Sequence, residues 1–248
     1  MRLFGLAGRK LGHSYSARFF TSRWDSLGIK AAYVPFEMDS VDNLLQTIIE
    51  NPELEGLNVT IPFKESVIPM LDRLSDEARS IGAVNCIKIL RNEGSVLLEG
   101  HNTDAYGFGK TLDAIDTEII DKALVLGTGG ASKAVCFALR ERGIEPVNVS
   151  RHSKKGTIRY EEIDRELTGQ CRLIVNTTPV GMWPETETPH PFPFTLISDT
   201  HVCIDIIYNP PLTMFLRNSA SRGAMIKNGL EMLRSQAVRS AEIWDIPV

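Results

Sequence analysis

The sequence lacks the cysteine and histidine patterns of disulfide-rich and metal-binding proteins. Its cysteines form no CxxC pair, and each stands among apolar residues: Cys86, Cys136, Cys171 and Cys203. We therefore expect buried thiols in a reducing compartment. The five histidines are dispersed and lack ligand spacing, so no metal site is expected.

Long apolar runs and an excess of positive charge are also missing. No uninterrupted apolar stretch is long enough to cross a bilayer, and the apolar run in "MRLFGLAGRK" is too short for a signal peptide. The formal net charge of -4 argues against a general nucleic-acid binder. We expect a cytoplasmic protein that binds neither membrane nor nucleic acid and works as a monomer or a homodimer.

The 248 residues instead alternate between strand-like and helix-like patterns. Such alternation is typical of βαβ crossovers and mostly parallel sheets, which predicts an α/β fold. We expect one domain over residues 1–101, joined by a C-terminal helix at 229–248, and a second domain over 102–228. The segment "PVGMWPETETPHPFPF" carries five prolines, which predicts an irregular loop over a site.

The stretch "ALVLGTGGASKAV" predicts a phosphate-binding turn between a strand and a helix. Its glycines allow a tight turn and close approach to a pyrophosphate, and the helix N-terminus supplies free N–H groups. Ser132 stands where the usual dinucleotide fingerprint has its third Gly or Ala. A tight turn without a ligand is the alternative.

The next predicted strand ends near Ser150 and is followed by basic residues. An NAD site typically has Asp or Glu at this point, to accept hydrogen bonds from the ribose. Here the sequence reads "SRHSKKG", with no carboxylate. Arg151 is suited to a 2′-phosphate, which favours NADP over NAD.

The stretch "NVTIPFK" places a lysine just after a proline. Proline commonly occupies the first position of a helix, so we expect a helix to begin at Pro62, with Lys64 in its first turn. A cation is mildly disfavoured there by the helix dipole. Polar residues at other predicted element ends, such as Ser14 and Asn85, fit a small polyhydroxylated acid or simple helix capping.

Eight motifs together resemble the shikimate dehydrogenase family. They occur in the family's order and cover the chain from Gly8 to Gln236: "GHSYS", "NVTIPFK", "IGAVN", "GHNTDAYG", "LGTGGASKA", "NTTPVGM", "DIIYNP" and "NGLEMLRSQA". The resemblance implies reversible NADPH-dependent reduction of 3-dehydroshikimate to shikimate in aromatic amino-acid synthesis. It also implies a substrate domain and a Rossmann-like NADP-binding domain, with the site in a cleft between them.

The family pattern implies a role for individual residues. Lys64 and Asp104 would be the catalytic pair. The substrate would be bound through its carboxylate and hydroxyls by Ser14, Ser16, Thr60, Asn85, Asp104 and Gln236, with Tyr208 nearby. NADP would be bound by Gly127, Thr128, Gly129, Gly130, Ala131, Ser150, Arg151 and Lys154, and by Ile206, Gly229 and Asp76.

The sequence departs from the family pattern at several positions. Arg9-Lys10-Leu11 and Ala17 stand where the family usually has prolines, Asn228 replaces a common Asp, and His101 is an additional titratable group. Two alternatives stay open: a quinate/shikimate dehydrogenase of broader substrate and cofactor use, or a non-catalytic NADP-binding regulatory relative. Retention of Lys64 and Asp104 argues against the second.

Overall fold

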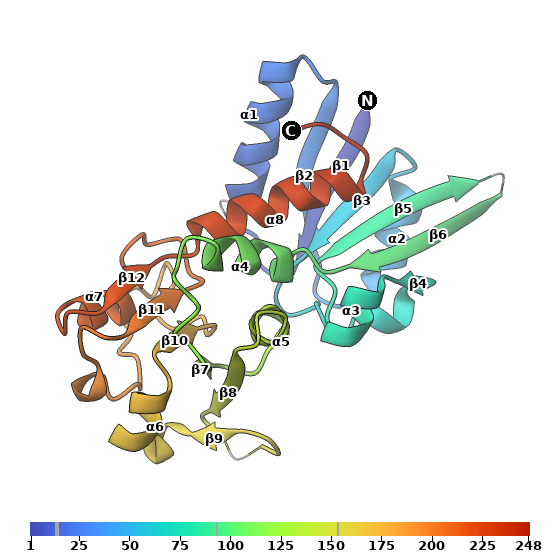
Figure 1. Ribbon diagram of the computed structural model, residues 1–248. Helices are drawn as coiled ribbons and strands as arrows, with labels where there is room; N and C mark the ends of the chain where they lie inside the picture. Colours follow the sequence, from blue (N-terminus) through green and yellow to red (C-terminus); the bar gives the residue numbers. More distant parts are fainter. Residues whose placement is uncertain (13–14, 93, 153) are drawn as a thin grey trace. The chain divides into compact units, whose positions relative to one another are not determined.

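The computed structural model describes residues 1–12, 15–92, 94–152 and 154–248. Its contacts divide the chain into two compact units (Figure 1). Unit 1 consists of Met1–Thr103 and Gln236–Val248, and unit 2 consists of Asp104–Ser235. The α/β class predicted from the sequence is confirmed.

The units divide at slightly different residues from the expected domain ends, for reasons visible in the hydrogen bonds. Asn102 Nδ2 donates to the Ala83 carbonyl at 2.9 Å, and Thr103 N donates to Asn85 Oδ1 at 2.6 Å. These bonds hold residues 102 and 103 in unit 1. At the other boundary, Gly229 N donates to the Ile207 carbonyl at 3.0 Å, which keeps Gly229 with unit 2.

Unit 1 contains a mixed six-stranded sheet in the order β2-β1-β3-β5-β6-β4. The strands are β1 (Arg2–Gly8), β2 (Ala31–Glu37), β3 (Leu54–Val59), β4 (Arg73–Leu74), β5 (Cys86–Asn92) and β6 (Ser95–His101). The helices are α1 (Tyr15–Leu27), α2 (Asn43–Glu50), α3 (Asp76–Ile81) and the 3₁₀ turn η1 (Ile68–Met70). Strand β5 runs antiparallel to both β3 and β6.

Helices cover both faces of the sheet in unit 1, and the alternation along β1 shows how. Phe4 faces a cluster that contains Phe20 and Trp24 of α1 and Ala237 of α8 (Leu230–Ile243). The neighbouring Leu3 faces the opposite cluster, which includes side chains of α2 and α3. Successive strand residues point to opposite faces, so the near-continuous apolar run of β1 is buried on both sides.

Unit 2 contains a wholly parallel six-stranded sheet in the order β12-β11-β10-β7-β8-β9. Its strands are β7 (Lys122–Leu126), β8 (Glu145–Ser150), β9 (Ile158–Arg159), β10 (Leu173–Asn176), β11 (Val202–Asp205) and β12 (Met225–Lys227). Its helices are α4 (Asp104–Leu112), α5 (Gly130–Arg140), α6 (Arg165–Gln170) and α7 (Met214–Ala220), with the 3₁₀ turns η2 (Tyr160–Glu162) and η3 (Phe194–Leu196).

The strand order of unit 2 reverses between β7 and β10. In open parallel sheets, ligands bind outside the carboxyl ends of the strands at such a switch point. The glycine turn follows β7 directly, and the "NTTPVGM" segment begins at the last residue of β10. The fold therefore places both motifs at the end of the sheet where a dinucleotide is expected.

The expected helix at Pro62 is wrong. Residues 61–67 form successive turns, followed by η1. The Lys64 carbonyl accepts a hydrogen bond from Val84 N at 2.7 Å, and Thr60 N donates to the Ala7 carbonyl at 2.9 Å. Val67 N donates to the Phe63 carbonyl at 3.0 Å, but this turn is not continued into a helix, because the Lys64 carbonyl is bonded to Val84 N. The helix-dipole argument for Lys64 therefore does not apply.

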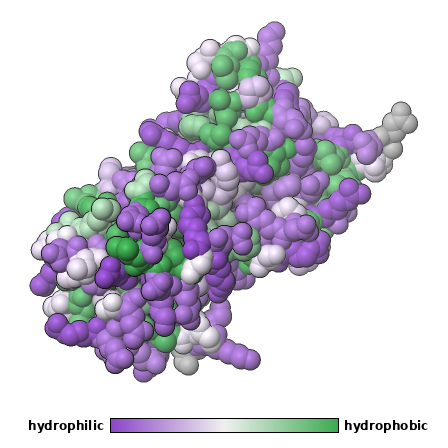
Figure 2. Space-filling view, in the orientation of Figure 1, coloured by the Kyte–Doolittle hydropathy of each residue, from purple (hydrophilic) through white to green (hydrophobic). Residues whose placement is uncertain are grey.

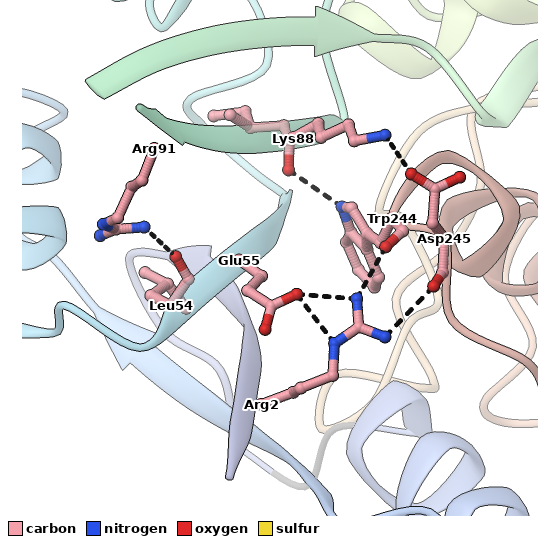
Figure 3. Close-up of polar contacts among 8 residues, drawn as sticks. Arg2, Leu54, Glu55, Lys88, Arg91, Trp244 and Asp245 are labelled. Atoms are coloured by element: carbon pink, nitrogen blue, oxygen red, sulfur yellow. Dashed lines mark hydrogen bonds and ion pairs between the residues drawn. The ribbon is translucent and has the colours of Figure 1, made fainter. Parts of the chain in front are cut away.

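The end of the chain is fastened to the sheet of unit 1 (Figure 3). Trp244 Nε1 donates to the Ile87 carbonyl at 2.9 Å. The Arg2 guanidinium donates to the carbonyls of Trp244 and Asp245 and forms an ion pair with Glu55. These contacts join the first strand to the last residues of the chain within one unit.

The proline-rich segment of unit 2 has no regular structure before η3, as expected from its composition. Trp183 within it is 56% exposed, and its backbone N–H donates to the Asn209 carbonyl at 3.1 Å. In the face shown in Figure 2, hydrophobic residues form separate patches among hydrophilic ones. The loop thus contributes one exposed aromatic ring next to the "DIIYNP" segment.

Candidate functional site

A network of buried polar side chains in unit 1 centres on Thr103. Its hydroxyl accepts from Asn85 Nδ2 at 3.0 Å, and lies 3.3 Å from Gln236 Oε1 and 3.3 Å from Ser240 Oγ. All four side chains are buried. Two of the predicted substrate residues, Asn85 and Gln236, are therefore joined through one hydroxyl although they lie far apart in the sequence.

The same network continues through Asn58 to Ser16. Asn58 Nδ2 donates to Ser240 Oγ at 2.8 Å, and Asn58 Oδ1 accepts from the Tyr33 hydroxyl at 2.9 Å. Burial raises the pKa of Tyr33 well above its ordinary value, and the Ser16 hydroxyl bonds to the same phenol. Tyr33 therefore keeps the proton that it donates. Ser14, predicted beside Ser16, lies outside the described residues.

Four members of this network were not among the predicted site residues: Asn58, Thr103, Tyr33 and Ser240. Ser240 follows Gln236 by one helical turn on α8, a spacing that places both on one face. That spacing was a usable signal. Tyr33 lies inside the apolar strand β2, where an aromatic residue is ordinarily part of the core, so no signal in the sequence distinguished it.

Thr60 and Lys64 lie in the turn that follows β3. The Thr60 backbone is tied to β1 through its bond to the Ala7 carbonyl, and its methyl group packs where Gly8 has no side chain. Lys64 is half-buried, and its carbonyl bonds to Val84 N, one residue before Asn85. The backbone of this turn is thus fixed to the segment that carries Asn85.

Asp104 begins α4 and is buried. It is joined by one peptide bond to Thr103, the centre of the polar network in unit 1. Consecutive Cα atoms lie about 3.8 Å apart across a trans peptide bond. The covalent chain alone therefore keeps the backbone of Asp104 next to that of Thr103.

The glycine turn of unit 2 fits a pyrophosphate. Gly127 has φ = 117°, and a Cβ there would lie 2.6 Å from Thr177 Oγ1. Gly129 is the N-cap of α5 without a side-chain cap, and a Cβ there would meet nothing within 4 Å. The first-turn N–H groups of a helix have no partner within the helix, so the start of α5 suits an anion. The predicted residues of this turn are Gly127, Thr128, Gly129, Gly130 and Ala131.

Ser132 shows how the turn accommodates a side chain in place of the usual third glycine. Its hydroxyl donates to the Gly127 carbonyl at 2.8 Å and accepts from Asn148 Nδ2 at 3.1 Å. Ser132 is buried against β8 by these bonds. The substitution thus adds two hydrogen bonds that hold the turn, and it does not obstruct it.

The basic segment after β8 presents its charges to solvent. Ser150 is half-buried at the end of the strand, while Arg151 and Lys154 are exposed. Burial raises the pKa of Tyr160 to about 12, and the positive charge of Arg151 opposes that shift. Arg151 therefore lies near Tyr160 at the carboxyl end of β8, where a ribose or its phosphate is expected.

Unit 2 brings together two residues predicted for the nicotinamide end. A Cβ at Gly229 would lie 1.9 Å from the Ile206 carbonyl oxygen, so only glycine permits this approach. Tyr208 is half-buried two residues further along the same segment. Asp76, also predicted to bind the cofactor, begins α3 in unit 1 and is exposed.

Sequence comparison identifies the family. A model described as "Shikimate dehydrogenase substrate binding domain" matches residues 6–87. A protein of Clostridium beijerinckii named shikimate dehydrogenase (NADP(+)) is 39% identical over 257 residues, with 98% of this chain and 92% of that protein covered. The chain belongs to the shikimate dehydrogenase family. The resemblance stated from the eight motifs is therefore confirmed.

Solved structures agree with this family assignment. A shikimate dehydrogenase from Aquifex aeolicus superposes with a TM-score of 0.87 at 34% identity, covering 99% of this chain and 92% of that one. A shikimate 5-dehydrogenase from Thermus thermophilus, in complex with NADP(H) and shikimate, gives a TM-score of 0.84 at 34% identity, covering 100% and 95%. The fold of the family extends over nearly the whole chain.

Among the described residues, no group of three or more His, Cys, Asp and Glu side chains is suited to a metal ion. Within the same residues, no helix combines the length and the apolar character needed to cross a membrane. The four cysteines are buried and free.

Proposed function

We propose that the protein catalyses the reversible, NADPH-dependent reduction of 3-dehydroshikimate to shikimate, a step of aromatic amino-acid synthesis. The near full-length match to relatives named shikimate dehydrogenase (NADP(+)) carries this proposal. The polar network of unit 1 and the glycine turn of unit 2 are the structural features that support it. They match, respectively, a polyhydroxylated acid and a dinucleotide.

The substrate is bound by residues tied to the polar network of unit 1. Ser14 and Ser16 bind the carboxylate; the ring hydroxyls are bound by Thr60, Asn85, Asp104 and Gln236, with Tyr208 nearby. The hydrogen bonds that fix Asn85 and Gln236 to Thr103 support this assignment. Buried amides held in this way have fixed donor and acceptor directions, which suits recognition of hydroxyl positions.

NADP is bound by the switch-point end of unit 2. The uncapped start of α5 receives the pyrophosphate at Gly127–Ala131, and Ser150, Arg151 and Lys154 bind the 2′-phosphate. Ile206 and Gly229 border the nicotinamide, with Asp76 as a further cofactor residue. When bound, NADPH supplies the hydride that reaches the carbonyl carbon of the substrate.

Lys64 and Asp104 act as the catalytic pair. Lys64, as an ammonium, donates a proton to the carbonyl oxygen during reduction, and the neutral amine takes the hydroxyl proton in the reverse direction. Asp104 orients the lysine and a substrate hydroxyl. Such proton transfer typically contributes ~10²–10⁴-fold to the rate. A series of hydrogen bonds supports the pairing. The Lys64 carbonyl accepts from Val84 N, and Val84 precedes Asn85. Asn85 in turn accepts from Thr103 N, and Thr103 precedes Asp104.

One absorbance assay tests this function against its alternatives. Shikimate and quinate are each combined with NADP and NAD, and the appearance of reduced nicotinamide is followed. We expect the highest kcat/KM for shikimate with NADP. Comparable values for quinate or NAD would indicate the broader enzyme, and no reduction in any combination would reject catalysis in favour of a regulatory role.

Location and assembly are part of the same proposal. We place the protein in the cytoplasm, because four buried free cysteines are typical of a reducing compartment. We expect a monomer or a homodimer, which light scattering of the purified chain distinguishes.

A further inference from the structure

Asp205, the last residue of β11, is a fully buried carboxylate with three hydrogen-bond donors. Its Oδ1 accepts from Ile207 N at 3.0 Å and from Asn176 Nδ2 at 3.1 Å. Its Oδ2 accepts from the Thr213 hydroxyl at 2.6 Å. The mechanism proposed above makes no use of this group, although it lies at the same end of the sheet as the glycine turn.

The hydrogen bonds around Asn176 fix the orientation of its side-chain amide. Asn176 Oδ1 accepts from Thr178 N at 3.0 Å and from the Thr178 hydroxyl at 2.7 Å, and His190 Nε2 lies 3.2 Å from it. Asn176 therefore presents its amide hydrogens to Asp205. Since Phe192 N donates to His190 Nδ1, the imidazole carries its proton on Nε2 and donates to Asn176.

This arrangement requires both side-chain oxygens of residue 205 to accept hydrogen bonds. Burial raises the pKa of Asp205 to about 6, and the bonds from Thr213, Ile207 and Asn176 oppose that shift. The three hydrogen bonds therefore favour the ionised carboxylate, which accepts from all three donors. An amide of the same shape has only one acceptor oxygen. Its NH2 group would face either the Thr213 hydroxyl or the N–H groups of Ile207 and Asn176, and a proton directed there would lose its acceptor.

The carboxylate holds the backbone that borders the nicotinamide end. Ile206 N donates to the Asn176 carbonyl at 3.1 Å, and Asp205 bonds to the next N–H, that of Ile207. Gly229 N then donates to the Ile207 carbonyl at 3.0 Å. The Ile206 carbonyl leaves no room for a side chain at Gly229. The position of this segment therefore depends on bonds that end at Asp205 and Asn176.

We propose that Asp205 is a positioning residue for the nicotinamide end of the NADP site, acting through the backbone of Ile206 and Ile207. It touches neither substrate nor cofactor. Thr213 supports it from the N-cap of α7, where its hydroxyl also accepts from Leu216 N. The inference rests on the proposed use of NADP by unit 2.

Binding of two ligands separates this role from a general contribution to folding. NADPH contains the nicotinamide, whereas 2′,5′-ADP contains only adenosine with its 2′- and 5′-phosphates. In the full-length Asp205→Asn protein we expect NADPH affinity to fall about tenfold or more, as for a buried bond to a charged group. Affinity for 2′,5′-ADP should stay within about twofold. Both are measured by equilibrium titration, NADPH by its fluorescence.

Two matched variants at position 213 allow the same test if the Asp205→Asn protein does not fold. Thr213→Val retains the shape and removes the hydroxyl, whereas Thr213→Ser retains the hydroxyl. We expect selective loss of NADPH affinity in the valine variant and near-normal binding in the serine variant. Ser219→Ala removes another buried hydroxyl of unit 2, one that donates to the Phe215 carbonyl, and should change neither affinity.

The outcomes separate this inference from the proposed function. Parallel loss of both affinities, or no loss in the folded variants, would overturn the positioning role. The activity of the unmodified protein with shikimate and NADP is measured alongside the variants. If it is inactive but NADPH binding still falls selectively in the variants, the proposed reaction fails and the positioning role stands.

Discussion

Lys64 owes its position to backbone bonds around it, because no helix begins at Pro62. Its carbonyl is fixed by Val84 N, and the turn before it is fixed to β1. Lys64→Met retains most of the apolar stem and removes the ammonium. We expect kcat to fall ~10²–10⁴-fold as the proton donor is lost, while the Kd for NADP stays unchanged. Steady-state kinetics and nucleotide titration measure the two quantities.

A lysine distant from the site serves as the control for this prediction. Lys30 is exposed in unit 1 and does not belong to the proposed site. Lys30→Met should keep normal turnover. A Lys64→Met protein with near-normal turnover would remove Lys64 from the catalytic pair.

His190 and Asp205 are buried titratable groups that both bond to Asn176. As pH falls, they change the free energy of unfolding in opposite directions. Burial lowers the pKa of His190 to about 4, so between its ordinary pKa of 6.5 and 4 the unfolded chain binds a proton that the folded chain does not. Stability falls there as pH falls. Burial raises the pKa of Asp205 to about 6, so the folded chain binds the extra proton and stability rises as pH falls.

Removing the histidine should therefore expose the effect of the aspartate. His190→Gln keeps an amide donor for Asn176 but does not titrate. Between pH 7 and pH 5 we expect its free energy of unfolding to decrease by about 2 kcal/mol less than that of the unmodified protein. Urea unfolding at both pH values measures this. His152→Gln, at an exposed position, should follow the unmodified protein; identical pH dependence in all three proteins would contradict the prediction.

At the scale of elements, we expect the carboxyl end of β8 to set the choice of nucleotide. Arg151 follows this strand directly and is exposed, with no carboxylate at the end of the strand. We expect Arg151→Ala to weaken NADP binding about tenfold or more, since a charge-assisted bond is lost. NAD lacks the 2′-phosphate, so its Kd should not change. Arg165→Ala, at the start of α6, is the control; equal losses for both nucleotides would contradict the role of Arg151.

The long elements were predictable because their patterns are local. The strand before Gly127, the helix after it and the hairpin of β5 and β6 each carry their own apolar pattern and turn residues. The edge strands β9 and β12 contain two and three residues and have no such pattern. The turn at Pro62 was mispredicted because bonds from Val84 and to Ala7, distant in sequence, replaced the local preference.

The site was predictable to a similar extent. Motif resemblance named Asn85 and Gln236, but only the folded chain shows that both bond to Thr103. The bonds of Asp205 connect three segments of unit 2 and have no signature in any one of them. Networks of this kind depend on strand order and register, which the sequence does not state.

At the scale of the molecule, Trp244 closes unit 1. It is buried and stacks on Phe4 with ring centroids 5.0 Å apart, over Gly56, whose missing side chain makes room for the indole. Trp244→Ala should lower the free energy of unfolding by about 3–5 kcal/mol, as for other large cavities. Chemical unfolding measures the loss. Trp183→Ala, at an exposed tryptophan, should cost far less; equal losses would contradict the role of Trp244.

The division of unit 1 between the two ends of the sequence also sets an order for folding during synthesis. Asp104–Ser235 is contiguous and leaves the ribosome complete, whereas the sheet that contains Phe4 waits for Gln236–Val248. Domains usually complete from the N-terminus first. Here α1 covers only part of the aromatic face of the first-made sheet until α8 has emerged, so this face is where a nascent chain most needs protection from aggregation.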